Sequence, residues 1–219
     1  MTSAAPSAPA RMVRAQGAEA ARLNALADHY FRATQDLDPL FGTESTGEER
    51  FLDKLEITIA PQSIARQRAL MLRAQRQLRA IHQDQLPEQD QTTYQLLERR
   101  LALGLESLQF EPELLPIDQY GGLPAQMAQY ATGQNLQPFE TVAHYQAFLR
   151  RLARLPAWNA QAMANMRRGI ARGITQPREI VERTIETLRP LAETPAQRHP
   201  FAMALQRFPV AVGVADQRR

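Results

Sequence analysis

The chain has 219 residues, a formal net charge of +3 and no cysteine. The lack of cysteine excludes a disulfide framework, a thiolate nucleophile and a cysteine-based metal site. Hydrophobic residues make up 44% and charged residues 22%, which is ordinary for a globular protein and excludes disorder along the whole chain. No apolar run reaches membrane-spanning length.

The first predicted helix covers about residues 18–37. Its apolar positions recur at helical spacing and form one stripe: Leu23, Leu26, Tyr30, Ala33 and Leu37. Asp38-Pro39 is predicted to stop this helix, because proline clashes with a continuing helical backbone. Residues 41–59 are then predicted to be loop-like, with at most a short extended piece in "LEITIA".

Five further helices are predicted downstream. They begin near Pro61, Leu86-Pro87, Thr141, Pro156 and Thr175, where a proline or a polar residue at the N-cap position precedes a periodic apolar run. The sequence therefore predicts an all-α fold, an antiparallel array of about six helices with one non-helical interruption near 111–138. Residues 1–17 are predicted to be a disordered or processed tail, and 18–219 a single helical domain.

The interruption is the best candidate for a ligand-contacting segment. "LPIDQYGGLPAQMAQYA" combines prolines, a Gly-Gly pair and polar aromatic groups on a segment held by helices. The candidate substrate-cleft residues, with Gln126 nearby, are Gln119, Tyr120, Gly121, Gly122 and Tyr130. The alternative is that this stretch is only a structured crossover between two helical pairs.

No catalytic residue and no metal ligand is predicted. The histidines His29, His82, His144 and His199 lie far apart in sequence, and the pattern H-E-x-x-H is absent. The G-x-S-x-G motif and phosphate-binding glycine loops are also absent. The arginines alternate with Glu, Asp and Gln along the helices, which favours a solvated charged surface over a nucleic-acid-binding face.

Several stretches together resemble a bacterial family known as domain of unknown function 885. They are "ERFLDKLEITIAP", "FEPELLPIDQYGG", "YQAFLRRLARLPAWNAQAMANMRRGIARGITQPREIVE" and "HPFAMALQRFP", and the tract from Tyr145 to Glu182 is the most specific. The resemblance extends from about Leu23 to Arg219. Members of this family look like helical zinc metallopeptidases of the gluzincin type.

The resemblance implies a zinc site on a helix carrying H-E-x-x-P-G-H-H in the C-terminal part of longer members. This sequence ends at "VADQRR" without that motif, so the resemblance transfers no catalytic residue to it. Zinc is expected only for full-length relatives. Many members carry an export signal, so a periplasmic or exported location is favoured by resemblance, although no signal peptide is visible.

The resemblance therefore implies the N-terminal, cleft-wall portion of a zinc-dependent peptidase, inactive by itself, with peptide as the substrate of the full-length form. The alternatives are a stand-alone helical interaction module and a vestigial, truncated gene product. A severed half is expected to self-associate through an exposed apolar face. No nucleic-acid partner is expected.

Overall fold

A computed structural model describes residues 8–133 and 136–206. Over these residues the protein consists of eight α-helices joined by turns and short 3-10 helices, with no β-strand, which confirms the predicted all-α fold. None of the described helices is long and apolar enough to cross a membrane. The described residues divide into two compact units. The first unit comprises 8–34 and 64–111, and the second comprises 35–63 and 112–206.

The N-terminal helix begins earlier than expected. Helix α1 spans Ala8–Leu37, so residues 8–17 of the predicted tail are helical, in keeping with an alanine-rich segment of high helix propensity. Residues 1–7 lie outside the described part of the chain. The boundary between the two units falls inside α1, after Thr34. The prediction of one domain over 18–219 stays a prediction.

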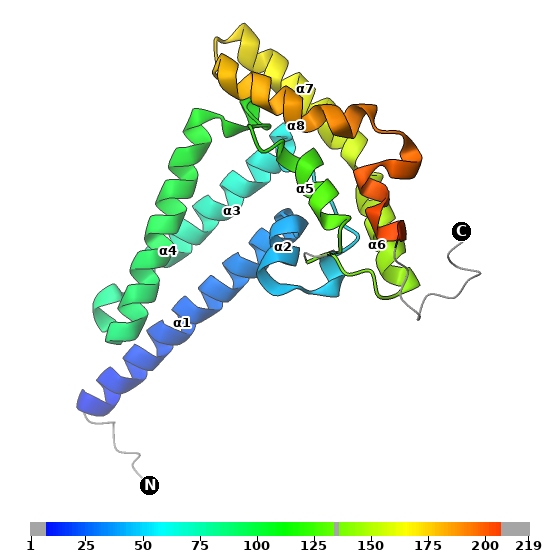
Figure 1. Ribbon diagram of the computed structural model, residues 1–219. Coiled ribbons are helices and arrows are strands. Elements are labelled where there is room, and N and C mark those ends of the chain that lie inside the picture. The colour runs from blue at the N-terminus through cyan, green and yellow to red at the C-terminus, as the bar shows by residue number, and fades with distance from the viewer. Residues whose placement is uncertain (1–7, 134–135, 207–219) are drawn as a thin grey trace. The chain divides into compact units, whose positions relative to one another are not determined.

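The first unit is built from the first part of α1 with α3 (Pro61–Arg79) and α4 (Glu88–Ser107), and successive helices run in opposite directions (Figure 1). The 3-10 turns η2 (Gln83–Gln85) and η3 (Leu108–Phe110) follow α3 and α4. Its core is formed by apolar side chains at helical spacing: Leu23, Leu26, Tyr30, Ala74, Leu78, Ile81, Leu86, Tyr94, Leu97 and Leu101. Leu23, Leu26 and Tyr30 of the stripe predicted for the first helix therefore do face this core.

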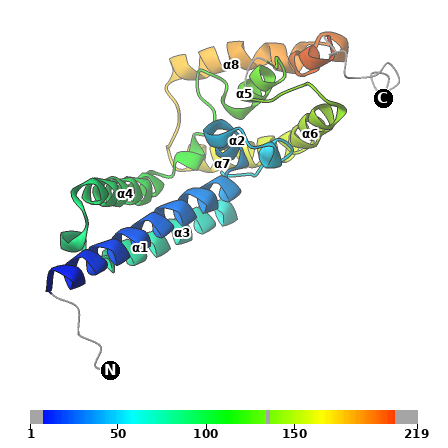
Figure 2. The same cartoon turned by 90° about the horizontal axis from the view of Figure 1, so that it is seen from below.

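The second unit contains α2 (Pro39–Thr46), α5 (Gly122–Tyr130), α6 (Val142–Leu152), α7 (Leu155–Ala171) and α8 (Arg178–Glu193). The 3-10 turns are η1 (Glu49–Phe51), η4 (Pro112–Leu114), η5 (Ala196–Arg198) and η6 (Pro200–Gln206). Its buried core consists of Leu55, Leu123, Met127, Tyr130, Ala131, Phe148, Leu155, Trp158 and Ala162. Helix α5 packs against α8 and η6, as the turned view also shows for α8 (Figure 2).

Two segments predicted to be irregular contain helices. Asp38-Pro39 does end α1, but it also begins α2, because the Asp38 carboxylate accepts a hydrogen bond from the N–H of Phe41 and proline suits the first helical turn. The expected interruption near 111–138 contains η4 and the nine-residue helix α5. Glycine and proline mark the start of α5 but do not prevent the helix that follows.

The ionised carboxylate of Asp38, the N-cap residue of α2, lowers the stability of the fold at neutral pH. Burial raises the pKa of Asp38 above its usual value, against the lowering effect of the hydrogen bonds from Phe41 and Leu40. A folded-state pKa above the unfolded value stabilises the fold below the unfolded pKa, and this contribution is lost as pH rises.

We therefore expect Asp38→Asn to raise the free energy of unfolding at pH 7 relative to the wild type, because asparagine caps a helix as well without the buried charge. The gain should shrink towards pH 3. Urea unfolding followed by the fluorescence of Trp158, the single tryptophan, reports on the second unit. The control Asp38→Ala loses the cap and should cost about 1 kcal/mol. A lower stability of Asp38→Asn at pH 7 would contradict this reading of the carboxylate.

Candidate functional site

The Gly-Gly pair shapes the start of α5. Gly121 has φ of 86° and Gly122 has φ of 58°, in the left-handed region that favours glycine. A Cβ on Gly121 would lie 2.8 Å from the Cβ of Ala125 and 3.1 Å from side-chain carbons of Thr187 and Leu188 on α8. Gly121 therefore permits the close approach of α8, which is a packing role.

Tyr120 stands in solvent just before this pair, with 76% of its surface exposed. Its N–H donates to the Asp118 carboxylate at 2.9 Å, and the carbonyl of Gln119 accepts from the Thr187 hydroxyl at 3.2 Å. The backbone of the turn is thus held from both sides while the aromatic ring of Tyr120 remains accessible. Its role as a cleft residue stays a prediction.

Tyr130 lies at the other end of α5 and belongs to a different group of residues. Its hydroxyl donates to Oε1 of Glu44 on α2 at 2.8 Å. The Gln126 amide donates to the same oxygen at 2.7 Å and lies 3.3 Å from the Tyr130 hydroxyl. The structure therefore joins Tyr130 and Gln126 with Glu44, which the sequence prediction missed because it assigned residues 41–59 to a loop.

The Tyr130 hydroxyl acts as a hydrogen-bond donor. Burial raises the pKa of Tyr130 well above its usual value, and the hydrogen bond to the Glu44 carboxylate raises it further. A phenol with a raised pKa stays protonated at neutral pH and is unsuited to act as a general base. The trio of Glu44, Gln126 and Tyr130 consequently offers one exposed carboxylate, oriented by two donors, to the solvent.

Arg151 on α6 lies fully buried beside this trio. Its guanidinium donates to the hydroxyl of Thr43 at 2.8 Å, the carbonyl of Phe51 at 2.7 Å, the side-chain oxygen of Gln137 at 2.9 Å and the carbonyl of Lys54 at 3.1 Å. Burial lowers the pKa of Arg151, yet arginine keeps its charge in proteins. Because Arg151 lies three residues after Phe148, its buried position was readable from the sequence, and the interpretation of the arginines as a solvated surface does not hold for Arg151.

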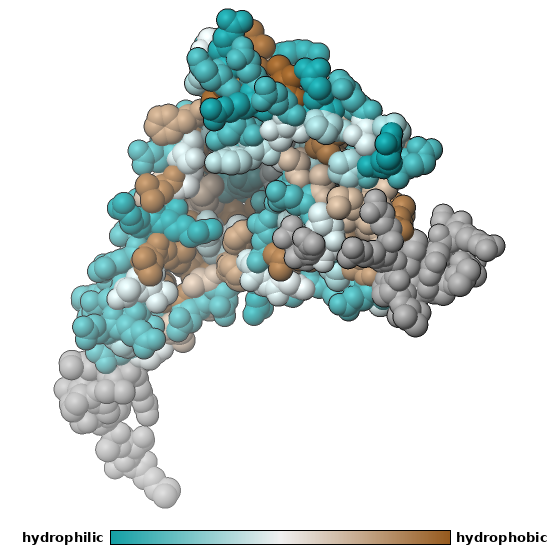
Figure 3. All heavy atoms as spheres, viewed as in Figure 1, coloured by the Kyte–Doolittle hydropathy of each residue, from teal (hydrophilic) through white to brown (hydrophobic). Residues whose placement is uncertain are grey.

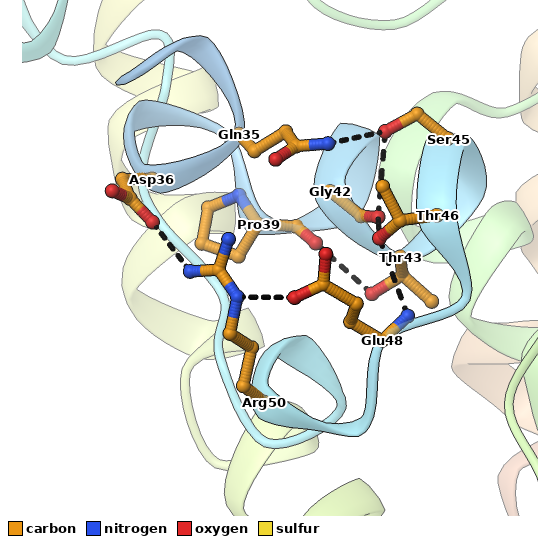
Figure 4. A network of polar contacts seen from close by, with 9 residues as sticks. All are labelled: Gln35, Asp36, Pro39, Gly42, Thr43, Ser45, Thr46, Glu48 and Arg50. Atoms are coloured by element: carbon orange, nitrogen blue, oxygen red, sulfur yellow. Dashed lines mark hydrogen bonds and ion pairs between the residues drawn. The ribbon is translucent and has the colours of Figure 1, made fainter. Parts of the chain in front are cut away.

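Residues 35–50, which include α2, are held by a polar network of their own (Figure 4). The Thr43 hydroxyl donates to the carbonyl of Pro39, and Arg50 bridges the carboxylates of Asp36 and Glu48. Gly42 packs so closely on the Phe51 ring that a Cβ would lie 2.9 Å from it. Helix α2, and with it the Glu44 carboxylate, is therefore fixed by packing and by side-chain hydrogen bonds.

A cavity of about 350 Å³ opens between α5, α7 and α8. Its lining is apolar apart from one amide: Ile117, Pro124, Leu155, Asn159, Met163, Leu188, Leu191, Ala192 and Phe201. Oδ1 of Asn159 is buried and has no hydrogen-bond partner. The volume lies within the range of small-ligand sites, which combine apolar walls with a few polar groups.

The described residues do not provide a catalytic zinc site. Nε2 of His144 lies 3.6 Å from a carboxylate oxygen of Glu49, while its Nδ1 accepts from the N–H of Glu140. This supplies two ligands, and a catalytic zinc ion needs three protein ligands and an open position. Within 8–133 and 136–206, no group of three or more His, Asp or Glu side chains could hold a metal ion. These residues therefore do not fit zinc.

The comparison with protein families identifies the chain. Residues 39–219 match the model of the family described as "Bacterial protein of unknown function (DUF885)". The chain belongs to this family, as its sequence resemblance predicted. No curated protein and no solved structure matches the chain. Helix α2, the Glu44 trio, Arg151 and the cavity all lie within the matched region.

Replacing Arg151 should destabilise the second unit strongly. Arg151→Met removes the donor of four hydrogen bonds and leaves buried acceptors unpaired, so we expect a loss of about 3 kcal/mol or more in the free energy of unfolding. The matched control is Arg150→Met at the next position, where an exposed arginine pairs with Asp53 and the change should stay within about 1 kcal/mol. Equal losses for the two variants, measured by urea unfolding with Trp158 fluorescence, would contradict the role of the buried network.

Proposed function

We propose that this chain forms a peptide-binding wall of a zinc-dependent peptidase of its family and does not cleave peptides by itself. The observation that carries the proposal is the concentration of binding groups around α5. The exposed Tyr120 precedes the helix, the Glu44 trio lies at its end, and the apolar cavity opens beside it. The family resemblance to gluzincin-type metallopeptidases supplies the expected substrate class.

These groups suit binding better than catalysis. The exposed Glu44 carboxylate is an acceptor for N–H groups, the ring of Tyr120 offers an aromatic face, and the cavity offers apolar surface. A hydrolase also needs a nucleophile with a base, or a metal-bound water. We assign that chemistry to a part of the family fold beyond the described residues, because the histidine and carboxylate groups found here do not fit zinc.

The proposal is tested by incubating the purified chain with a defined mixture of unstructured peptides and Zn²⁺. We expect peptides to bind, detected by a change in Trp158 fluorescence, and mass spectrometry to show no new fragments. Tyr120→Ala should weaken binding several-fold, about 3- to 10-fold for the loss of one exposed aromatic contact. The control Phe110→Ala removes a similarly exposed ring (73%, against 76% for Tyr120) in the first unit and should leave binding unchanged.

Two results would overturn the proposal. Zinc-dependent cleavage by this chain would show a complete active site. If no peptide in the mixture binds, the proposed role of the chain as a peptide-binding wall is contradicted.

A second function is supported by a different surface, in the first unit. Leu96 and Leu103 are 65% and 50% exposed and lie seven residues apart on α4, which places them on the same side of this helix. Phe110, which is 73% exposed, follows in the 3-10 turn η3. Figure 3 shows apolar groups over α4 on its visible face. Next to Leu96 lies a hollow of about 260 Å³ whose lining includes Phe31. An exposed apolar patch of this kind is typical of an interaction surface. A second copy of the chain is its proposed partner.

If α4 mediates self-association, sedimentation velocity should show a concentration-dependent dimer in the wild type. The double variant Leu96→Gln and Leu103→Gln should sediment as a monomer, with at least a tenfold weaker association. Leu149→Gln, at a similarly exposed leucine of α6 in the second unit, is the matched control and should leave the dimer intact. A wild type that stays monomeric at all concentrations would exclude this interaction.

A further inference from the structure

We infer that the cavity between α5, α7 and α8 binds an uncharged apolar side chain of a peptide, and that Asn159 accepts a hydrogen bond from the peptide N–H beside that side chain. This subsite rests on the proposed function, because it takes the ligand to be a peptide. It adds the class of side chain and the residue that selects it.

The walls of the cavity are fixed by the core of the second unit. Leu155 lines the cavity and is 5% exposed, and the neighbouring core contains Trp158 on the same helix. Met163 stands half-exposed among the lining residues and has an adaptable, unbranched side chain. A rigid wall with an adaptable methionine suits apolar side chains of different shape, such as leucine, methionine and phenylalanine.

The cavity discriminates against charge. None of its lining residues is ionisable. The nearest charged side chains of α8 in sequence form their own i,i+4 pair, with Arg189 3.7 Å from Glu193. An aspartate or lysine side chain placed in the cavity would lose part of its hydration without gaining an opposite charge, which is unfavourable.

Asn159 differs from the other amides of α7. The Gln161 amide donates to Oδ1 of Asn165 at 2.9 Å, and the Asn165 amide donates to the carbonyl of Ile59 at 2.9 Å. Oδ1 of Asn159 is buried without any donor. A buried acceptor left unpaired is costly, and a ligand N–H that reaches it removes this cost. Oδ1 is shielded from solvent although the Asn159 side chain lines the cavity, and the broad terminal torsion of asparagine lets a partial turn of the amide expose Oδ1 to a ligand.

The experiment uses two small probes that differ in one atom. Acetyl-leucinamide carries the leucine N–H, and its depsi analogue has an ester oxygen in that position. Binding is followed by chemical-shift changes of the α7 backbone amides and by Trp158 fluorescence. In the wild type we expect acetyl-leucinamide to bind about five- to tenfold more tightly than the ester, the worth of one hydrogen bond. Acetyl-aspartamide should not bind at the concentrations used.

Two variants and one control identify the site. Asn159→Leu should bind the amide and the ester equally, because the acceptor is gone while the apolar wall remains. Ala192→Phe fills the cavity from an exposed position and should weaken both probes at least tenfold. Gln161→Leu, an amide of the same helix outside the cavity lining, should keep the preference for the amide probe. The two variants are separate tests, so if one of them fails to fold, the other and the two-probe comparison on the wild type still decide the question.

The outcomes separate the subsite from the proposed function. Equal binding of amide and ester to the wild type, or binding that Ala192→Phe leaves unchanged, overturns the subsite. If longer peptides nevertheless bind to the wild-type chain, the proposed peptide-binding function stands without this subsite. The opposite result is also informative. If the chain prefers acetyl-leucinamide through Asn159 but fails to bind any of the longer peptides, the cavity is supported as a site and the proposed function is overturned.

Discussion

The stability of the second unit depends on one buried charge, the guanidinium of Arg151. Burying a guanidinium removes it from water at a high cost, and a partner carboxylate commonly offsets that cost. Among the described residues, the acceptors of Arg151 are all neutral: two backbone carbonyls, one hydroxyl and one amide oxygen. The stabilisation therefore comes from several hydrogen bonds at once, together with the electrostatic attraction of the nearby Asp53 and Glu44 carboxylates. If the segment around Thr43 and Phe51 moved, the charge would lose several partners together.

This dependence connects parts of the chain that are distant in sequence. Thr43 and Arg151 are 108 residues apart, and the second unit is formed by 35–63 together with 112–206. The intervening residues 64–111 belong to the first unit. Arg151 can satisfy its donors only after these two parts have met, so the second unit assembles through long-range contacts, which are slow to form. Helix α2 and the Glu44 carboxylate gain their fixed position from the same event.

The sequence predicted the elements with strong periodicity and missed the ones defined by distant partners. The stripe of Leu23, Leu26 and Tyr30 reports a local pattern, and it faces the core as expected. Asp38-Pro39 was read as a stop signal, although the same pair is a good helix start. Its helix is short, and its hydrophobic pattern is too brief to outweigh the polar residues that follow. The α5 segment was missed as a helix for the same reason.

The candidate site shows the same division between local and distant information. The special backbone of Gly121 and Gly122 was predictable, because glycine pairs permit such conformations. That Tyr130 meets Glu44 was not predictable, since the partners lie 86 residues apart and α2 was read as a loop. Asn159 has no sequence signal, because its importance lies in the absence of a donor around it, which only three-dimensional packing determines.

Two amide side chains each have one buried polar atom without a hydrogen bond among the described residues, and their different surroundings decide what each signifies. Gln137 is fully buried, its oxygen accepts from Arg151, and only its Nε2 is unpaired. Its orientation is therefore explained by the charge that it helps to solvate. Asn159 lines a cavity open to solvent, and no charge explains its placement. An unpaired group indicates a ligand only where its side chain borders a cavity, and that condition selects Asn159 over Gln137.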